Sequence, residues 1–189
     1  MMMRIPWMTS ALVLVMLTAS PGLAAPPTDC SKGPVPAGPA KGQFNGSPFV
    51  VDNVRMQGLS ISHPGINGVT FDAYSLFFEQ NSTDGATRYV EIDTIVPEGT
   101  KPDGKTFRHI PAETEFQPQI TPGAPEVQGW ALSDDAHNID VNSMDDKKGS
   151  LQIAFGKRKG KTLTGTVNFC TPSAKGTRFG GTFTFEIQE

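Results

Sequence analysis

Hydrophobic and polar residues alternate along most of this chain with the period of two that a β-strand imposes. The alternation is clearest where Val69, Phe71 and Ala73 are interleaved with Thr70 and Asp72. Because successive side chains of a strand point to opposite faces, this pattern is typical of antiparallel sheets packed on one side. It predicts strands over residues 49–57, 59–62, 69–80, 87–97, 105–110, 127–133, 138–143, 149–156, 161–170 and 180–188.

Turn-forming residue pairs separate these runs at the spacing of an all-β domain. They are Asn67-Gly68, Asp84-Gly85, Asp103-Gly104 and Lys159-Gly160, and such pairs favour tight hairpins. After the amino-terminal region no run keeps a 3.6-residue apolar period, so we expect at most one short helical turn. The pattern predicts an antiparallel two-sheet β-sandwich of the jelly-roll or immunoglobulin-like type, with a closed β-barrel as the runner-up.

One segment, residues 97–125, does not fit a simple succession of hairpins. It contains six prolines and only one plausible short strand. Long proline-bearing loops in small domains are either functional or stiff surface connections. We favour a crossover between the two sheets, and a preformed binding ridge is the alternative.

The amino terminus has the pattern of a cleaved bacterial-type signal peptide. Arg4 precedes an apolar run over 11–19, and small residues, Gly22 and Ala24, stand at the −3 and −1 positions of the expected cleavage site. The run has about half the length that a bilayer span needs, so an uncleaved anchor is the less favoured alternative. We expect residues 1–24 to be removed, residues 25–48 to form a Pro/Gly-rich arm, and residues 49–189 to form a single secreted or periplasmic β-sandwich without a transmembrane segment.

The two cysteines, Cys30 and Cys170, predict one disulfide. Cys30 lies in the proline-rich arm, and Cys170 ends the strand predicted over residues 161–170. An even cysteine count in an oxidising compartment favours a bridge, which would staple the arm to the sheet. A redox or metal-binding pair is less favoured, because there is no Cys-x-x-Cys and no histidine near either cysteine in the sequence.

Charge is unevenly distributed along the chain. Without residues 1–24 the chain has 15 basic and 19 acidic side chains, a net charge of −4 that argues against nucleic-acid binding. Residues 84–146 hold 13 acidic and 4 basic side chains, whereas residues 147–178 hold 8 basic and no acidic ones. The densest cations, in the turn "GKRKGK", are the candidate anion-binding residues Lys157, Arg158, Lys159 and Lys161.

Segregated charge of this kind steers polyanions to one end of a domain. The partners it indicates are an anionic glycan, a lipid headgroup or an acidic protein surface. Two simpler interpretations stay open. In one, the lysines keep hairpin tips soluble and prevent sheet edges from pairing with other chains. In the other, the basic and acidic segments pair with each other in the fold.

The acidic stretch over residues 133–146 is the candidate cation site. Its possible ligands are Asp134, Asp135, Asp140 and Asp145, carboxylates of the kind that calcium prefers. The spacing is not that of an EF-hand loop, and a solvated acidic loop is the simpler interpretation. We therefore expect no cofactor, with calcium as the one possible ion.

Catalytic patterns are weak. The three histidines are scattered, and no serine stands in a Gly-x-Ser-x-Gly setting. Glu91 and Asp93 share one face of a predicted strand, where a solvated face is the simplest explanation. Trp130 lies beside Gly129, a residue that favours a bulge, and is more typical of a core than of a sugar platform.

These observations favour an exported, non-catalytic binding or accessory domain of the cell envelope or extracellular space. In this hypothesis a basic hairpin binds an anionic ligand or surface. One alternative is a small secreted metal-dependent or hydrolytic enzyme that uses the acidic loop 133–146. The other is a purely structural β-sandwich.

Overall fold

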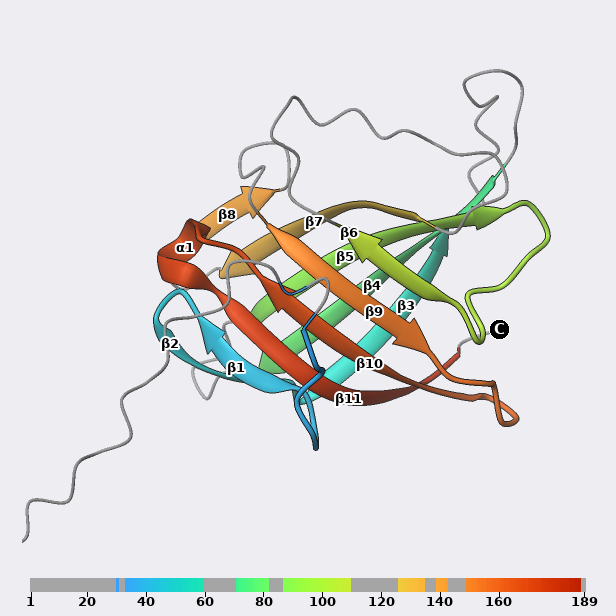
Figure 1. The fold of residues 1–189 in the computed structure, drawn as a ribbon, viewed down its shortest axis with the longest axis horizontal. Helices are drawn as coiled ribbons and strands as arrows, with labels where there is room; N and C mark the ends of the chain where they lie inside the picture. Colours follow the sequence, from blue (N-terminus) through green and yellow to red (C-terminus); the bar gives the residue numbers. More distant parts are fainter. Residues whose placement is uncertain are drawn as a thin grey trace, which may run out of the picture.

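The chain forms two antiparallel sheets that face each other across one apolar core. The computed structural model describes Cys30 and residues 33–59, 71–81, 87–109, 126–134, 139–142 and 149–187. Within these ranges there are eleven strands and a single short helix, α1 (Ser173–Gly176), in agreement with the predicted all-β class (Figure 1). No helix in this part of the chain has the length and hydrophobicity that a bilayer span requires.

The first sheet has six strands. In spatial order they are β2 (Ser47–Val50), β1 (Lys41–Phe44), β11 (Arg178–Glu186), β10 (Thr162–Cys170), β9 (Ser150–Phe155) and β6 (Thr106–His109). All of its pairings are antiparallel, and the β10–β11 pair is the longest, from Thr162 opposite Glu186 to Cys170 opposite Arg178.

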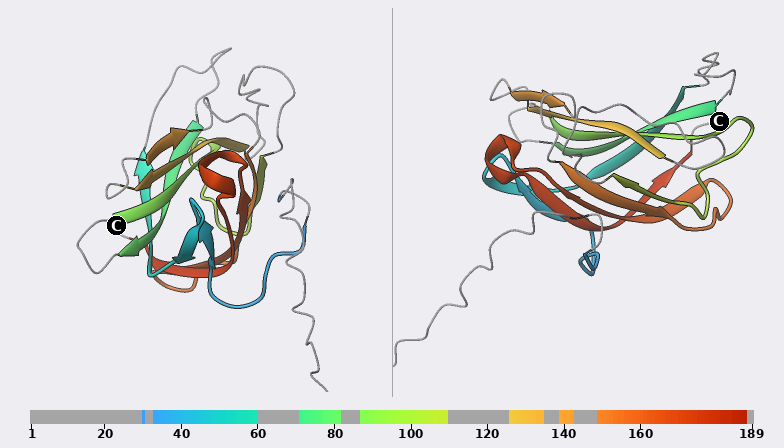
Figure 2. Two further views of the ribbon diagram at one scale, coloured as in Figure 1. Left: turned by 90° about the vertical axis from the view of Figure 1, so that its left-hand side faces the viewer. Right: turned by 45° about the horizontal axis from the view of Figure 1, so that its top comes forward.

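The second sheet has five strands. In spatial order they are β3 (Asn53–Leu59), β4 (Phe71–Asn81), β5 (Thr87–Pro97), β7 (Glu126–Asp134) and β8 (Ile139–Asn142). Figure 2 shows the two sheets as facing layers. The described strands are not joined into one closed barrel, so the runner-up fold is wrong. The assignment to the jelly-roll or immunoglobulin-like type stays a prediction.

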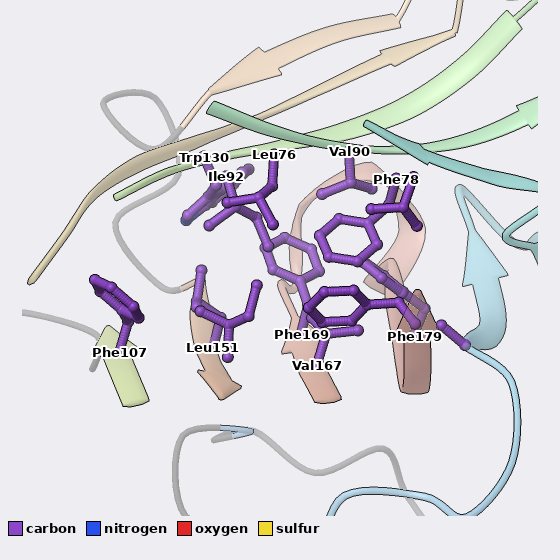
Figure 3. Close-up of a cluster of buried hydrophobic side chains, with 14 of the residues drawn as sticks. Leu76, Phe78, Val90, Ile92, Phe107, Trp130, Leu151, Val167, Phe169 and Phe179 are labelled. Carbon is purple, nitrogen blue, oxygen red and sulfur yellow. The ribbon is translucent and has the colours of Figure 1, made fainter. Parts of the chain in front are cut away.

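The core lies between the layers and is built from the inward side chains of both. Phe169 and Phe179 of the six-stranded sheet meet Leu76, Phe78 and Ile92 of the other, all fully or almost fully buried (Figure 3). Burial of each such side chain contributes about 1.5–3 kcal/mol to the stability of the fold. This contribution explains why apolar residues recur at every second position of the strands.

Trp130 belongs to this core, as its strand context indicated. Its side chain is 2% exposed, and its ring meets Phe169 edge-on at a centroid distance of 5.3 Å. The register of β5 against β7 shifts at Asp93, so the bulge that Gly129 signalled is present. The bulge leaves Trp130 inside the core rather than turning it outward.

The amino-terminal arm differs from its prediction. Residues 41–44 and 47–48 lie within the expected arm, yet they form β1 and the start of β2, and β1 is paired on both sides. The strand forms where the chain is free of proline, and Pro48 lies in the edge strand β2, where its missing N–H costs nothing. Residues 49–57 were expected to be one strand, but the chain passes from β2 in one sheet to β3 in the other.

A hairpin missed by the strand prediction joins β1 to β2. Asn45 and Gly46 have φ of 48° and 80°, the two positive angles that a type I′ turn requires and that Asn-Gly favours. Of the predicted turn pairs, Asn67-Gly68 and Asp84-Gly85 lie outside the described residues, as do the signal peptide over residues 1–24 and most of the strand predicted over 59–62.

Within the arm, Cys30 and residues 33–40 cross the outer face of the six-stranded sheet. The predicted disulfide joins Cys30 to Cys170, with Cα atoms 5.7 Å apart. Further along, Gly38 O accepts a hydrogen bond from Thr182 N at 2.7 Å, so the arm runs from β10 across to β11 (Figure 1). The arm therefore forms a strap over this face.

Candidate functional site

The β9–β10 turn carries the four cations singled out by the sequence. Lys159 N donates to Thr162 O at 2.9 Å and Thr162 N donates to Lys159 O at 3.0 Å, which leaves Gly160 and Lys161 as a two-residue loop. Gly160 has φ of 60°, the positive angle that a type II′ turn needs at its first central position. Lys157, Lys159 and Lys161 are exposed around this turn.

The β5–β6 connection packs beside this turn and adds two lysines. Gly104 N donates to Gly156 O, and Phe155 N donates to Lys105 O, both at 2.9 Å. These bonds place Lys101 and Lys105 at the same end of the molecule as the turn. We call the six cations of this region the basic end: Lys101, Lys105, Lys157, Arg158, Lys159 and Lys161.

The crossover prediction for this connection is confirmed in its described part, since β5 belongs to one sheet and β6 to the other. Tyr74 helps to hold it, because its hydroxyl donates to Thr100 O at 3.3 Å. Burial raises the pKa of Tyr74, and the charges of Asp72 and Asp103 raise it further. The connection is thus anchored to β4, which keeps Lys101 and Lys105 near the turn.

One of the six cations is used internally. Arg158 Nε lies 3.5 Å from Asp103 Oδ2, and both side chains are about a quarter exposed. The lysines of the turn make no ion pair with a described residue. The described acidic side chains of the same region are Asp72, Glu98, Asp103 and Glu186, so among described residues cations exceed carboxylates six to four. The excess is modest, and it is carried by lysines on the exposed loops.

Other cations of the basic segment do not join this group. Lys175 and Arg178 lie beyond the far end of β10 from the turn. Nine strand residues separate the two ends, which corresponds to about 26 Å at the rise of a β-strand. Lys175 and Arg178 belong to the same basic stretch of sequence, but they do not adjoin the turn. Lys147 and Lys148 lie outside the described residues.

The predicted cation ligands are not brought together where they are described. Asp134 is 2% exposed and lies 2.8 Å from Arg88 Nε, so its charge is already balanced. Asp140 is exposed and pairs across the ladder with Ser133, the neighbour of Asp134 in β7. Adjacent strand residues face opposite sides, so these two carboxylates lie on different faces of the sheet. Asp135 and Asp145 lie outside the described residues.

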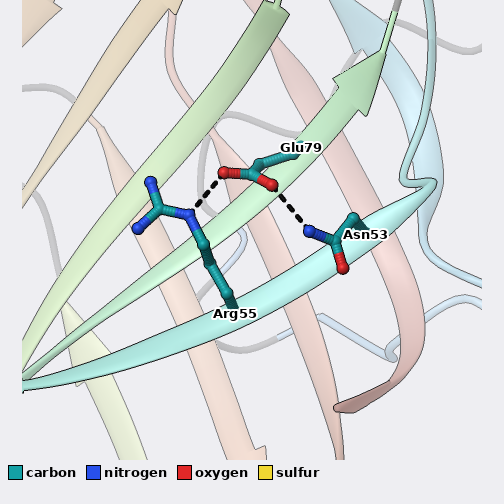
Figure 4. Close-up of polar contacts among 3 residues, drawn as sticks. All are labelled: Asn53, Arg55 and Glu79. Carbon is teal, nitrogen blue, oxygen red and sulfur yellow. Dashed lines mark hydrogen bonds and ion pairs between the residues drawn. The ribbon is translucent and has the colours of Figure 1, made fainter. Parts of the chain in front are cut away.

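The outer face of the five-stranded sheet carries a paired polar network. The Glu79 carboxylate accepts from Arg55 Nε at 2.6 Å and from Asn53 Nδ2 at 2.7 Å (Figure 4). The Arg55 guanidinium also lies 3.6 Å from the centroid of the Phe77 ring, a cation–π geometry. Arg55 is nearly half exposed, so this pair adds little stability and chiefly orients the side chains.

Glu91 and Asp93 share this outer face, as their spacing predicted. Ser75 donates a hydrogen bond to Asp93. Burial raises the pKa of Glu91 and the nearby charge of Asp93 raises it further, whereas Ser75 and Arg55 lower it. Burial also raises the pKa of Asp93, and the Ser75 hydroxyl partly offsets that rise. Two carboxylates of this kind resist ionisation together, but the described residues place no nucleophile–base pair beside them.

The acidic and basic side chains of the described chain differ in how their charge is compensated. No three His, Cys, Asp or Glu side chains of the described chain gather closely enough to hold a metal ion. Glu79 and Asp134 are engaged by arginines, whereas the turn lysines point to solvent. No protein-family model, curated protein or solved structure matches this chain.

Lys101 and Lys105 are members of the basic end that the sequence prediction missed. They lie more than fifty positions before the turn, in the proline-bearing segment. No local pattern links the two segments. Only the pairing of β6 with β9 brings them side by side.

Proposed function

We propose that this protein is an exported, non-catalytic binding domain whose basic end attaches to an anionic polymer, with an anionic glycan as its partner. The supporting observation is the convergence of lysines from two connections, β5–β6 and β9–β10, on one end of the domain. The disulfide accords with an oxidising compartment, where such polymers are found.

The chemistry of the basic end favours a charged polymer over an inserted membrane. Among described residues Val50 is the one exposed large hydrophobic side chain, and it lies in β2, away from the basic end. Lysines supply point charges rather than the planar fork of arginine, so the contact is electrostatic and tolerant of geometry. Such contacts are screened over about 8–10 Å at physiological salt, and binding should weaken steeply as salt rises.

The test is retention on immobilised heparin, used as a sulfated glycan probe. Replacement of Lys157 and Lys159 by Ser should lower the salt concentration at elution. It should also reduce the slope of log affinity against log salt by up to about two, one for each lost contact. Exposed turn lysines contribute little to stability, so the melting temperature should stay within the range of ordinary surface substitutions.

A matched control removes two charges from the opposite half of the domain. The Lys41→Ser, Lys175→Ser variant has the same net charge as the test variant but keeps the basic end intact. It should elute close to the parent protein. Equal elution of the two variants would show that only net charge matters and would refute the proposal. Binding to vesicles of phosphatidylglycerol but not to heparin would assign the basic end to lipid headgroups instead.

A further inference from the structure

The strap formed by the arm leaves two hollows on the outer face of the six-stranded sheet. One has a volume of about 440 Å³ and lies toward β2, and the other has about 240 Å³ and lies toward β10. Both are lined by Pro36 of the strap and by Lys41, Gly42 and Gly180 beneath it. They are therefore neighbours on either side of Pro36 and form one site, which we call the strap groove.

The strand register sets the chemistry of this groove. One row across the sheet runs from Val50 through Lys41 and Gly180 to Asn168, and residues opposite one another share a face. The next row on the same face pairs Gln43 with Arg178. The apolar end therefore lies at β2, and the cationic and polar groups follow from β1 to β10.

Gly180 forms the floor of the groove where the strap passes close above it. A Cβ atom on Gly180 would lie 2.8 Å from Pro36 Cδ. This position therefore excludes a side chain, which lets Pro36 lie low over β11 while open space remains on each side of it.

The larger hollow is mainly apolar. Pro48, Phe49 and Val50 line it together with the strap, and Val50 is 47% exposed. A concave, mainly apolar surface with a few polar groups is the usual form of a small-molecule site, and Val50 belongs to the apolar part of this one. A volume of this size accommodates the apolar body of a small ligand.

The smaller hollow supplies positive charge. Arg178 and Lys41 both line it, and neither makes an ion pair with a described residue. Asn168 contributes an amide whose Nδ2 donates to Cys30 O at 3.1 Å. No acidic residue of the described chain lines either hollow. A mainly apolar groove with two uncompensated cations at one end is complementary to an anionic head joined to an apolar body.

We propose that the strap groove binds a small anionic amphiphile of the fatty-carboxylate class. Its head lies at Arg178 and Lys41, and its chain passes beside Pro36 toward Val50. This site is independent of the basic end, because it uses the arm and strands β1, β2, β10 and β11 rather than the loops that carry the turn lysines.

The test is calorimetric titration of the disulfide-bonded protein with dodecanoate below its micelle concentration. We expect saturable binding to one site, with roughly tenfold weaker affinity in an Arg178→Gln variant, because a charge-assisted contact is lost. Val50→Ser should weaken binding to dodecanoate and to 1-dodecanol, which has the same chain without the charge. A Lys159→Gln variant, altered at the basic end, should bind dodecanoate as the parent does.

Three results would overturn the proposal: no saturable dodecanoate binding, equal affinity for dodecanoate and 1-dodecanol, or unchanged dodecanoate affinity in both the Arg178 and Val50 variants. Val50 is exposed, so its variant keeps the test valid if Arg178→Gln does not fold. Loss of heparin retention in basic-end variants has no bearing on this result, which keeps the two proposals separable.

Discussion

Removal of the Cys30–Cys170 disulfide should lower the free energy of unfolding by an amount that follows from the length of the loop it closes. The bridge closes a loop with a sequence separation of 140 residues. In the chain-entropy description, a cross-link over that length lowers the entropy of the unfolded chain by about 17 cal/mol/K, or about 5 kcal/mol at 25 °C. Domains of this kind are stabilised by about 5–15 kcal/mol in total. The Cys30→Ala, Cys170→Ala variant should therefore lose a large part of its stability.

The assay is urea unfolding of both proteins without reductant. We expect the free energy of unfolding of the variant to fall by about 5 kcal/mol. Its m-value should rise, because the unfolded chain without the cross-link exposes more surface. A Ser150→Ala variant with the bridge intact separates the cross-link from its contacts. It removes the acceptor for Cys30 N, a 2.7 Å hydrogen bond, and the 3.3 Å contact of Ser150 Oγ with Cys170 Sγ. The change should cost about 1 kcal/mol.

In this account the bridge stabilises the protein by restricting the unfolded chain. A loss below about 1 kcal/mol in the double variant, or an m-value equal to that of the parent, would refute it. A loss matched by Ser150→Ala would instead assign the stabilisation to local packing of the strap.

Two further perturbations test the core and the acidic face. Gly149→Ala places a Cβ atom 2.7 Å from Trp130 Nε1, and such overpacking should lower the free energy of unfolding by about 1–3 kcal/mol in urea titrations; an unchanged midpoint would contradict this packing. For Glu91 the pKa is raised in the folded state, so stability falls as pH rises from the unfolded pKa through the folded one. Glu91→Gln should therefore raise the melting temperature at pH 7 more than at pH 4, and an equal effect at both values would argue against a charged, half-buried Glu91.

Local pattern predicted much of the fold because each strand buries one face. Alternation places β5 at residues 87–97, in agreement with the structure, and it places β4, β9 and β10 to within two residues. The same alternation gave a wrong strand prediction at residues 49–57, because the apolar pattern continues from β2 into β3 although the chain passes from one sheet to the other. Period two determines the face of a side chain, and it carries no information about the strand beside it.

The basic end shows the same limit. The turn at 157–161 was recognisable from its sequence, since glycines and cations in that order are typical of a tight hairpin tip. Lys101 and Lys105 lie beside the turn because β6 pairs with β9. Lys175 and Arg178 lie far from it because the full length of β10 separates them from the turn. Closeness in sequence and closeness in space diverge whenever an extended strand lies between two residues.

The sequence by itself determined the all-β class, the disulfide pair, the tight turn of cations and most strands, because each is set by local chemistry or by a count. Only the tertiary structure decided that the arm becomes a strap over the six-stranded sheet, that Asp134 pairs with Arg88, and that Lys41 and Arg178 meet an apolar groove. These features depend on which strands are neighbours. That choice is made by long-range antiparallel pairing and by the cross-link, and no short stretch of sequence records it.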